Sequence, residues 1–474
     1  MTEPSVYILD TTLREGELNP SVYYTSGMLE TLGLALARLG TPRIEYSVTY
    51  PQRGGSIRDL RNIISTLQGS YENVVPVIQC RALAADIDIA QELGARGCGI
   101  YIAISQEHRR YKLNGISLDK VINRIEESMD LLKDYGFKYR RAVLEDASRF
   151  FTQYKGEEDT LGTFRTLIET ADRAGATVVS IPDTAGIMNP TGALEMFRFA
   201  SSVTKKELAA HFHNDYGNSL GNTLSVVREG YAKEAHVSIY GLGSGVGIAD
   251  HYEVSANLMD NMGMTTGQDR GYFRELYAIF QETTKIPIPW NHPLSDHART
   301  EKAGTHQAQQ LKSPGGYVPQ KKLTHDFDNR IIFQAGRMMS RHLVQRLLEG
   351  LEVPREHADE IVKVISARST VYNRKLNSPE LKAIVRDVAG IDVSTTQISQ
   401  YIGPDRAFYL LRVTPHLTTD ITEKIMEFEG VINVLETFGT FDIFVEANLE
   451  ADVQRRIEES FGQDILEIQP LIIG

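Results

Sequence analysis

Two short polar stretches, far apart in the chain, carry side chains of the kind that bind metal ions. The first is residues 10–17 (DTTLREGE) after an apolar run, and the second is residues 211–215 (HFHND). In a strand, residues i and i+2 face the same side, so His211 and His213 point into one space. With Glu15 they make a three-ligand set that leaves coordination positions open for a substrate. We therefore predict a catalytic divalent metal site.

Arg14 directly precedes the predicted ligand Glu15. Its guanidinium would lie beside the metal, where it can stabilise negative charge that develops during a reaction. Two imidazoles and a carboxylate suit Zn, Mn, Co or Mg, so the ligand set alone does not choose the metal.

The length and composition of the chain limit its class. A chain of 474 residues suits one large domain with one or two smaller ones. The formal net charge of -12 argues against broad nucleic-acid binding. No segment approaches the roughly 20 apolar residues of a membrane helix, and the N-terminus lacks the features of a signal peptide. Cys80 and Cys98 in apolar stretches suit a reducing compartment. We expect a cytoplasmic protein without nucleic-acid or membrane partners.

Residues 6 to about 262 read as eight strand-then-helix units, within a predicted catalytic domain of residues 1–285. The predicted strands begin near Val6, Arg43, Val74, Cys98, Lys138, Thr177, Glu207 and Glu234. Eight such units in this length are typical of a (β/α)8 TIM barrel. The alternative, a doubly wound open sheet, usually has a glycine-rich first turn and fewer units. The first turn here contains Arg14 and Glu15 instead, which favours the barrel.

The barrel prediction places the polar motifs on one face, because active-site groups of such barrels lie at the carboxyl ends of the strands. The first strand leads into Arg14, the fifth into Glu145, the sixth into Thr184 and the seventh into His211. A glycine-rich stretch, residues 241–247, follows the eighth strand.

Two further domains are predicted after the barrel. Prolines at 287 and 289 mark a boundary, and residues 286–404 form a linker with helices at 329–349, 355–368 and 378–388. Residues 405–474 show the βαββαβ order of a ferredoxin-like domain. That order resembles the amino-acid-sensing domains of the leucine-responsive regulators, which bind effectors at subunit interfaces.

These motifs together resemble the acyl-CoA-dependent Claisen condensing enzymes, the homocitrate synthase and isopropylmalate synthase family, also called DRE-TIM metallolyases. The homocitrate synthase branch is the nearer one, because archaeal-type members carry a similar C-terminal sensor domain. The resemblance implies an acyltransferase of amino-acid biosynthesis, most simply lysine biosynthesis, that condenses acetyl-CoA with a 2-oxo acid. It also implies a homodimer or a higher homo-oligomer.

The resemblance assigns roles to individual residues. Glu15, His211 and His213 match the family's metal ligands, and Arg14 matches the arginine that holds the 2-oxo acid oxygen and stabilises the enolate. The remaining matches are Arg141 and Glu145, which contact substrate, Thr184, which binds its carboxylate, and the catalytic pair His306 and Tyr317, which reach into the partner subunit's site. A histidine such as His306 can remove a proton from the acetyl methyl group near neutral pH.

Several residues depart from the homocitrate synthase pattern: Leu18, Leu83 (expected at a substrate-facing histidine position), Ala209, and Ser244, Gly245 and Ile248 after strand eight. A different 2-oxo acid, such as oxaloacetate or 2-oxoisovalerate, therefore stays open. Two other classes also remain. One is a carbon–carbon lyase like hydroxymethylglutaryl-CoA lyase, although those enzymes carry a cysteine after strand eight and this chain has none there. The other is a catalytically dead amino-acid sensor.

Overall fold

The computed structural model describes residues 3–52, 54–153, 160–351, 353–403, 405–437, 439–448 and 451–471. The chain forms two compact units, Met1–Pro293 and Leu294–Gly474. The predicted barrel boundary at residue 285 falls shortly before this division. The predicted boundary between residues 404 and 405 lies within the second unit and stays a prediction.

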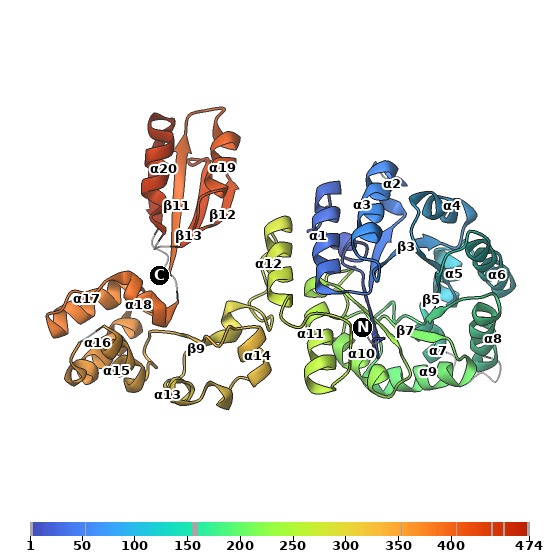
Figure 1. Ribbon diagram of the computed structural model, residues 1–474, viewed down its shortest axis with the longest axis horizontal. Coiled ribbons are helices and arrows are strands. Elements are labelled where there is room, and N and C mark those ends of the chain that lie inside the picture. The colour runs from blue at the N-terminus through green and yellow to red at the C-terminus, as the bar shows by residue number, and fades with distance from the viewer. Residues whose placement is uncertain are drawn as a thin grey trace. The chain divides into compact units, whose positions relative to one another are not determined.

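The first unit is a closed barrel of eight parallel strands that follow one another in chain order (Figure 1). The strands are β1 (Tyr7–Asp10), β2 (Arg43–Ser47), β3 (Val75–Arg81), β4 (Gly97–Ala103), β5 (Tyr139–Glu145), β6 (Val178–Ser180), β7 (Glu207–Ala210) and β8 (Glu234–Val237). The barrel closes where β1 pairs with β8, with Tyr7 opposite Glu234. This confirms the predicted (β/α)8 fold and rules out the open sheet.

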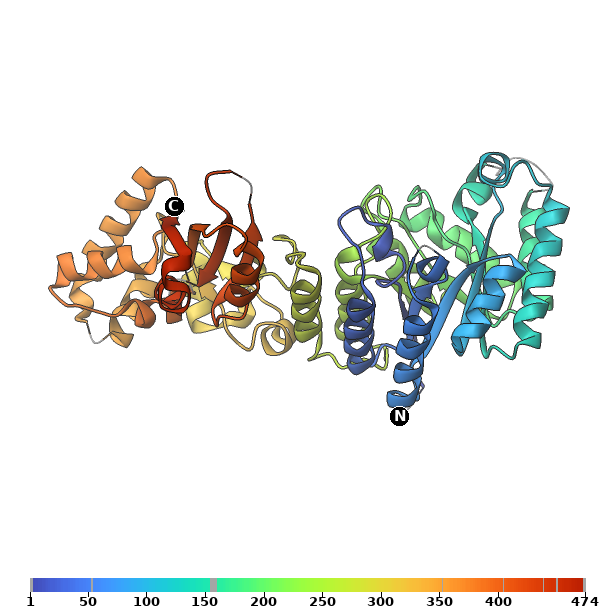
Figure 2. The ribbon, with the colours of Figure 1, turned by 90° about the horizontal axis from the view of Figure 1, so that it is seen from above.

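Helices surround the barrel strands in two perpendicular views (Figures 1 and 2). They are α1 (Ser26–Leu39), α2 (Thr49–Gln52), α3 (Ile57–Ser70), α4 (Ala84–Leu93), α5 (Gln106–Tyr111), α6 (Leu118–Asp134), α7 (Ala147–Gln153), α8 (Thr160–Arg173), α9 (Pro190–Val203), α10 (Ser219–Arg228), α11 (His251–Ala256) and α12 (Phe273–Thr284). Helix α6 shows why they form. Ser117 caps its first turn, and Val121, Ile125 and Met129 recur every four residues on one buried face.

The barrel interior has an apolar layer that includes Leu9, Val77, Val178 and Ala209. Buried charged residues from neighbouring strands also point into the barrel, among them Arg141. Charged groups are stable there only when they are paired, and the pairs described below provide this.

The second unit begins with helices and two short strands. These are β9 (Thr300–Glu301), α13 (Gly304–Lys312), α14 (Gln320–His325), β10 (Ile332–Phe333), α15 (Arg341–Gly350), α16 (Ala358–Tyr372), α17 (Ser378–Ala389) and α18 (Thr395–Ile402). The prediction of a helix at 329–349 was wrong in the first half of that range. Strand β10 occupies part of that stretch, and α15 starts only after Ser340, whose side chain caps it.

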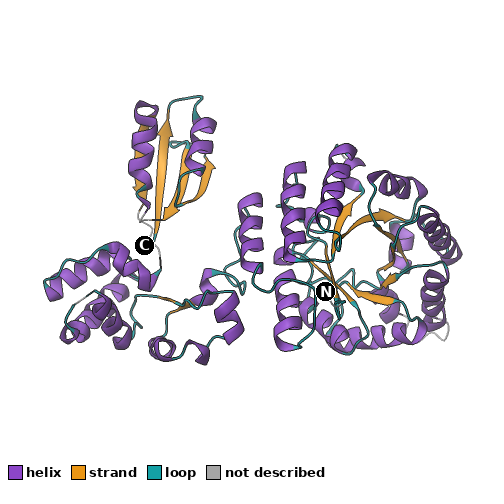
Figure 3. Ribbon diagram, in the orientation of Figure 1, coloured by secondary structure: helices purple, strands orange, loops and turns teal. Residues whose placement is uncertain are grey.

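The C-terminal elements form a four-stranded antiparallel sheet in the order β12-β13-β11-β14 (Figure 3). The chain order is β11 (Arg406–Val413), α19 (Thr418–Met426), β12 (Val431–Glu436), β13 (Ile443–Asn448), α20 (Val453–Phe461) and β14 (Ile465–Leu471), which confirms the βαββαβ prediction. Alternate residues of β11, such as Tyr409 and Leu411, belong to one apolar core with Ile425 and Ile457 of the helices. None of the helices that the structure describes is long and apolar enough to cross a membrane.

Candidate active site

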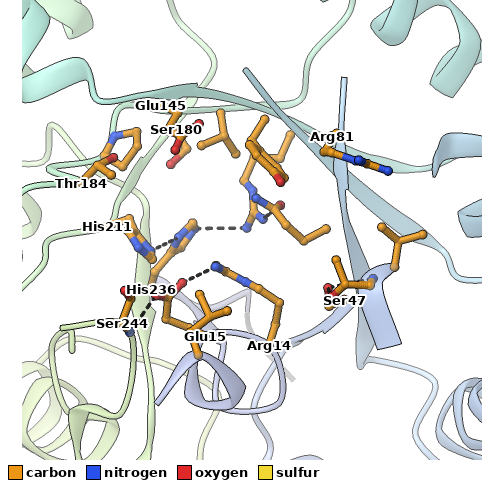
Figure 4. A pocket seen from close by; sticks show the side chains of 18 of the residues that line it. Arg14, Glu15, Ser47, Arg81, Glu145, Ser180, Thr184, His211, His236 and Ser244 are labelled. Atoms are coloured by element: carbon orange, nitrogen blue, oxygen red, sulfur yellow. Dashed lines mark hydrogen bonds and ion pairs between the residues drawn. The ribbon is translucent and has the colours of Figure 1, made fainter. Parts of the chain in front are cut away.

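A cavity of about 370 Å³ lies at the carboxyl ends of the barrel strands. Side chains from many of the strands converge on it, including Arg14 after β1, Ser47 at the end of β2 and Glu145 at the end of β5 (Figure 4). Because all strands of the barrel are parallel, residues far apart in the chain meet at this one end. The sequence prediction of a shared face is therefore matched by the geometry.

The three predicted metal ligands come together in this cavity. One candidate ligand atom from each of Glu15, His211 and His213 lies within 4.8 Å of the others, and all three residues are buried. Strand β7 ends at Ala210, but residues 211–213 stay extended, because the backbone of Asp183 hydrogen-bonds to both histidines. Phe212 points the other way and packs on Phe197. Two imidazoles and one carboxylate fit a divalent metal with open positions.

The Glu15 carboxylate is held from two sides. One oxygen makes an ion pair with Arg14, and the other lies 3.9 Å from His213 Nε2. The backbone N–H of Ser244, in the glycine-rich loop, lies 3.4 Å from that second oxygen. Glycine lets this loop approach closely, since a Cβ on Gly243 would lie only 3.0 Å from Glu15 Cγ.

His211 presents one ring nitrogen to the ligand cluster. Its Nδ1 lies 3.2 Å from His236 Nδ1, which leaves Nε2 for a metal. Burial, together with the nearby positive charges, lowers the pKa of His211 well below its ordinary value. The ring is therefore neutral, the state in which imidazole binds metals.

Arg14 and Arg141 share a buried carboxylate. Arg14 Nε donates to Glu45 at 2.6 Å, and Arg141 makes an ion pair with Glu45 and donates to Gln79 at 2.6 Å. Burial alone would raise the pKa of Glu45, but the two arginine charges outweigh burial and lower it. Both arginines line the cavity, so this network fixes two positive groups at its wall.

Thr184 and Glu145 also line the cavity. Thr184 Oγ1 accepts a hydrogen bond from the backbone N–H of Asp146 at 3.0 Å, so its own hydroxyl proton can point elsewhere. It does not cap the next helix, because Asn189 caps α9. Glu145 accepts from Lys112 at 2.5 Å. Their predicted roles in substrate binding remain predictions.

The structure adds residues that sequence reasoning missed. Ser180, at the end of β6, lines the cavity, and its fully buried Oγ has no hydrogen-bond partner among the described residues. Gln79 and Lys112 also line the cavity. A single serine or glutamine in a strand gives no sequence signal, because its exposure depends on where the strand ends.

One predicted position was wrong. Leu83 was expected at the substrate-facing site of strand three, but β3 ends at Arg81, and Arg81 lines the cavity while Leu83 precedes α4. Of the other departures, Leu18 lines the cavity, Ala209 lies in the apolar barrel layer, and Ile248 is buried beside the backbone of His213. The departures that line the cavity are therefore Leu18 and Ser244.

His306 and Tyr317 lie in the second unit, at α13 and just after a proline turn. Their rings stack with centroids 4.1 Å apart, and His306 Nδ1 lies 3.2 Å from a carboxylate oxygen of Glu301. The two predicted residues therefore contact each other. Their catalytic role in a partner subunit's site remains a prediction.

The barrel, the neighbouring arginine and three residues that could hold a divalent metal define the class as a (β/α)8 enzyme. Residues 5–279 match the HMGL-like family, and the chain belongs to that family. This agrees with the family resemblance inferred from the motifs.

Curated relatives extend the similarity to the second unit. The homocitrate synthase of Sulfolobus acidocaldarius is 30% identical over 96% of this chain and 94% of its own length. The homocitrate synthase of Saccharolobus islandicus is 28% identical over 93% of this chain and 92% of its own length. Among solved structures, the HMG-CoA lyases of Bacillus subtilis (TM-score 0.52, 20% identity, 61% of this chain and 97% of that one) and Brucella melitensis (0.51, 20%, 60% and 100%) share the fold.

Proposed function

We propose that this protein is an acyltransferase that condenses the acetyl group of acetyl-CoA with a 2-oxo acid. The observation that carries the proposal is the convergence of Glu15, His211 and His213 beside Arg14 in one cavity. The whole-length similarity to homocitrate synthases supports the same reaction. The cavity and its ligand set suit a small anionic substrate that chelates a metal.

A divalent metal bound here supplies Lewis-acid polarisation of the 2-oxo carbonyl. His306 is the proposed base that takes a proton from the acetyl methyl group, and Glu301 orients its ring. The electrons of that C–H bond then form the new bond to the carbonyl carbon. Arg14 stabilises the resulting alkoxide, which takes up the proton that His306 removed from the methyl group. Water then hydrolyses the thioester and releases CoA.

The cavity wall offers groups for the substrate carboxylates. Arg141, Thr184 and Ser180 are proposed to hold the carboxylate next to the ketone. Arg81 and Lys112 add positive charge at the cavity wall, although each is paired with a carboxylate. The whole-length similarity to homocitrate synthases supports a dicarboxylic substrate, 2-oxoglutarate first and oxaloacetate second, before 2-oxoisovalerate.

The function is tested by thiol release from acetyl-CoA. Metal-stripped protein is reloaded with Mn²⁺, Mg²⁺, Zn²⁺ or Co²⁺ and offered 2-oxoglutarate, oxaloacetate or 2-oxoisovalerate. We expect metal-dependent CoA release with a dicarboxylic acid and none after stripping. Cleavage of hydroxymethylglutaryl-CoA without condensation would identify a lyase. No turnover with any metal and acid would leave only the sensor alternative.

The wider setting belongs to the same proposal. The two cysteines, Cys80 and Cys98, are buried and free, which suits a reducing cytoplasm. We propose a homodimer in which His306 and Tyr317 serve the neighbouring subunit. The C-terminal βαββαβ domain is proposed to bind an amino-acid effector, with lysine as the first to test if the product is homocitrate.

A further inference from the structure

A second histidine stands directly behind one of the proposed metal ligands. His236 lies on β8 and is almost completely buried. Its Nδ1 is 3.2 Å from Nδ1 of His211, and its Nε2 is 2.7 Å from a carboxylate oxygen of Glu234. The close view shows His236 and His211 side by side at the cavity (Figure 4).

The position of each proton in this chain of contacts follows from the groups at its far end. Burial alone would raise the pKa of Glu234, but the charge of Arg43 and the bond from His236 outweigh it and lower the pKa. Glu234 is therefore a carboxylate, and it also accepts from Tyr139 at 2.9 Å. A carboxylate can only accept, so Nε2 of His236 must carry the proton.

Nδ1 of His211 and Nδ1 of His236 face each other at 3.2 Å, so one must donate and the other accept. A singly protonated His236 that donates to Glu234 through Nε2 accepts through Nδ1, and Nδ1 of His211 is then the donor. Arg141 Nη1 also lies 3.4 Å from His236 Nε2. A guanidinium only donates hydrogen bonds, so it cannot accept one from the Nε2 proton of His236. His211 is left with a free lone pair on Nε2, the nitrogen not engaged with His236.

We propose that His236 and Glu234 are positioning residues that hold His211 in the tautomer and orientation needed to bind the metal through Nε2. The proposal rests on the metal role of Glu15, His211 and His213. Hydrogen bonds from a metal-bound histidine to an outer partner fix its ring and raise its basicity, and their loss typically weakens metal affinity about 10- to 100-fold. Here an imidazole lies between the ligand and the carboxylate, so two residues share that task.

The test measures metal binding without substrate. His236→Phe keeps a ring of similar size but removes both nitrogens, so we expect the dissociation constant for Mn²⁺ to rise about 10- to 100-fold. His236→Asn restores an acceptor near the Nδ1 position, but Glu234 no longer fixes which end of the amide faces His211, so its affinity should lie between those of the wild type and His236→Phe. Free Mn²⁺ is counted by electron paramagnetic resonance during titration of the metal-stripped protein.

A matched control separates positioning from packing. His292 is a buried histidine of the same unit that does not belong to the ligand cluster, so His292→Phe should leave the Mn²⁺ affinity unchanged. A folded His236→Phe protein with wild-type affinity overturns the proposal. So does an asparagine variant as weak as the phenylalanine variant.

A second variant covers the case in which His236→Phe does not fold. Glu234→Gln keeps the shape but offers His236 a donor as well as an acceptor, so the tautomer is no longer fixed and Mn²⁺ affinity should fall. Unchanged affinity overturns the proposal. Wild-type protein that binds Mn²⁺ yet releases no CoA refutes the proposed function and leaves the positioning role standing. Wild-type protein that binds none of the metals refutes both.

Discussion

Individual side chains at the cavity are paired before a substrate arrives. Arg14 contacts Glu15 and Glu45, and Arg141 contacts Glu45 and Gln79. Long charged side chains lose entropy when they are ordered, and these contacts have already ordered the two arginines. A preorganised cation costs little reorganisation when charge develops on the substrate.

Arg14 gives the first prediction at this scale. Arg14→Gln removes the charge that stabilises the alkoxide, so kcat for CoA release should fall about 100- to 1,000-fold, the usual cost of losing such a donor. Steady-state thiol release is the measurement. Arg38→Gln is the control, because Arg38 is exposed and pairs with Glu275 on the outside of the barrel. Equal kcat values for the two variants would refute the role of Arg14.

Secondary-structure elements set where these side chains lie. The loop after β8 returns on itself so tightly that a Cβ on Gly247 would lie 1.8 Å from the carbonyl oxygen of Gly241, and Gly247 has φ +87°. The same loop brings the Ser244 N–H to Glu15. The glycines are therefore needed for the shape of the loop, and through it for the position of a proposed ligand.

The second prediction concerns this loop. Gly247→Ala must displace the backbone of Gly241, so it should lower both the unfolding temperature and the Mn²⁺ affinity. Gly230→Ala is the matched control, because Gly230 has φ +73° but open space around its Cα. It should cost only the strain of the left-handed conformation, about 1–2 kcal/mol, with Mn²⁺ affinity unchanged. Identical behaviour of the two variants contradicts this account.

Strand β2 gives the third prediction through Glu45. The pKa of Glu45 is lower in the folded protein than its ordinary value of 4.5. A carboxyl group whose pKa is lowered by folding stabilises the folded state at pH values above its unfolded-state pKa. This stabilisation is lost as the pH falls through the folded-state pKa. Denaturant unfolding of wild type and Glu45→Gln should therefore differ most near neutral pH, with the gap closing below about pH 4.5. A gap that widens on acidification would contradict the assignment.

The sequence predicted the elements better than it predicted the cavity. The hydrophobic runs placed each barrel strand start close to its observed position, because parallel strands buried on both faces read as apolar runs. They did not locate the end of β3 well enough to identify Arg81, rather than Leu83, as the residue that faces the cavity. Closure of the barrel brings Glu45, Gln79 and His236 to their partners. The spacing of these residues along the chain does not predict those contacts.

At the scale of the whole molecule, the chain adds a helical segment and a βαββαβ domain to the barrel. His306 and Tyr317 belong to that second unit, and they already contact each other and Glu301. If they serve a neighbouring subunit, one functional site requires two chains. That arrangement would make assembly a condition for activity.

Subunit complementation is the fourth prediction. Glu15→Gln loses a metal ligand and His306→Ala loses the proposed base, so each variant alone should release no CoA. Co-expressed with different tags and purified through both, the mixed dimer contains one intact site and should regain activity. A mixed dimer as inactive as its parents would place His306 in its own subunit's site or outside catalysis.

The central claim is that one divalent metal is held by Glu15, His211 and His213. A crystal of the Mn²⁺-reconstituted protein, measured for anomalous scattering, tests it most directly. We predict a single strong peak within about 2.0–2.3 Å of the Glu15 carboxylate and of Nε2 of both histidines. A peak at another place in the protein, or none at this cluster, would contradict the account.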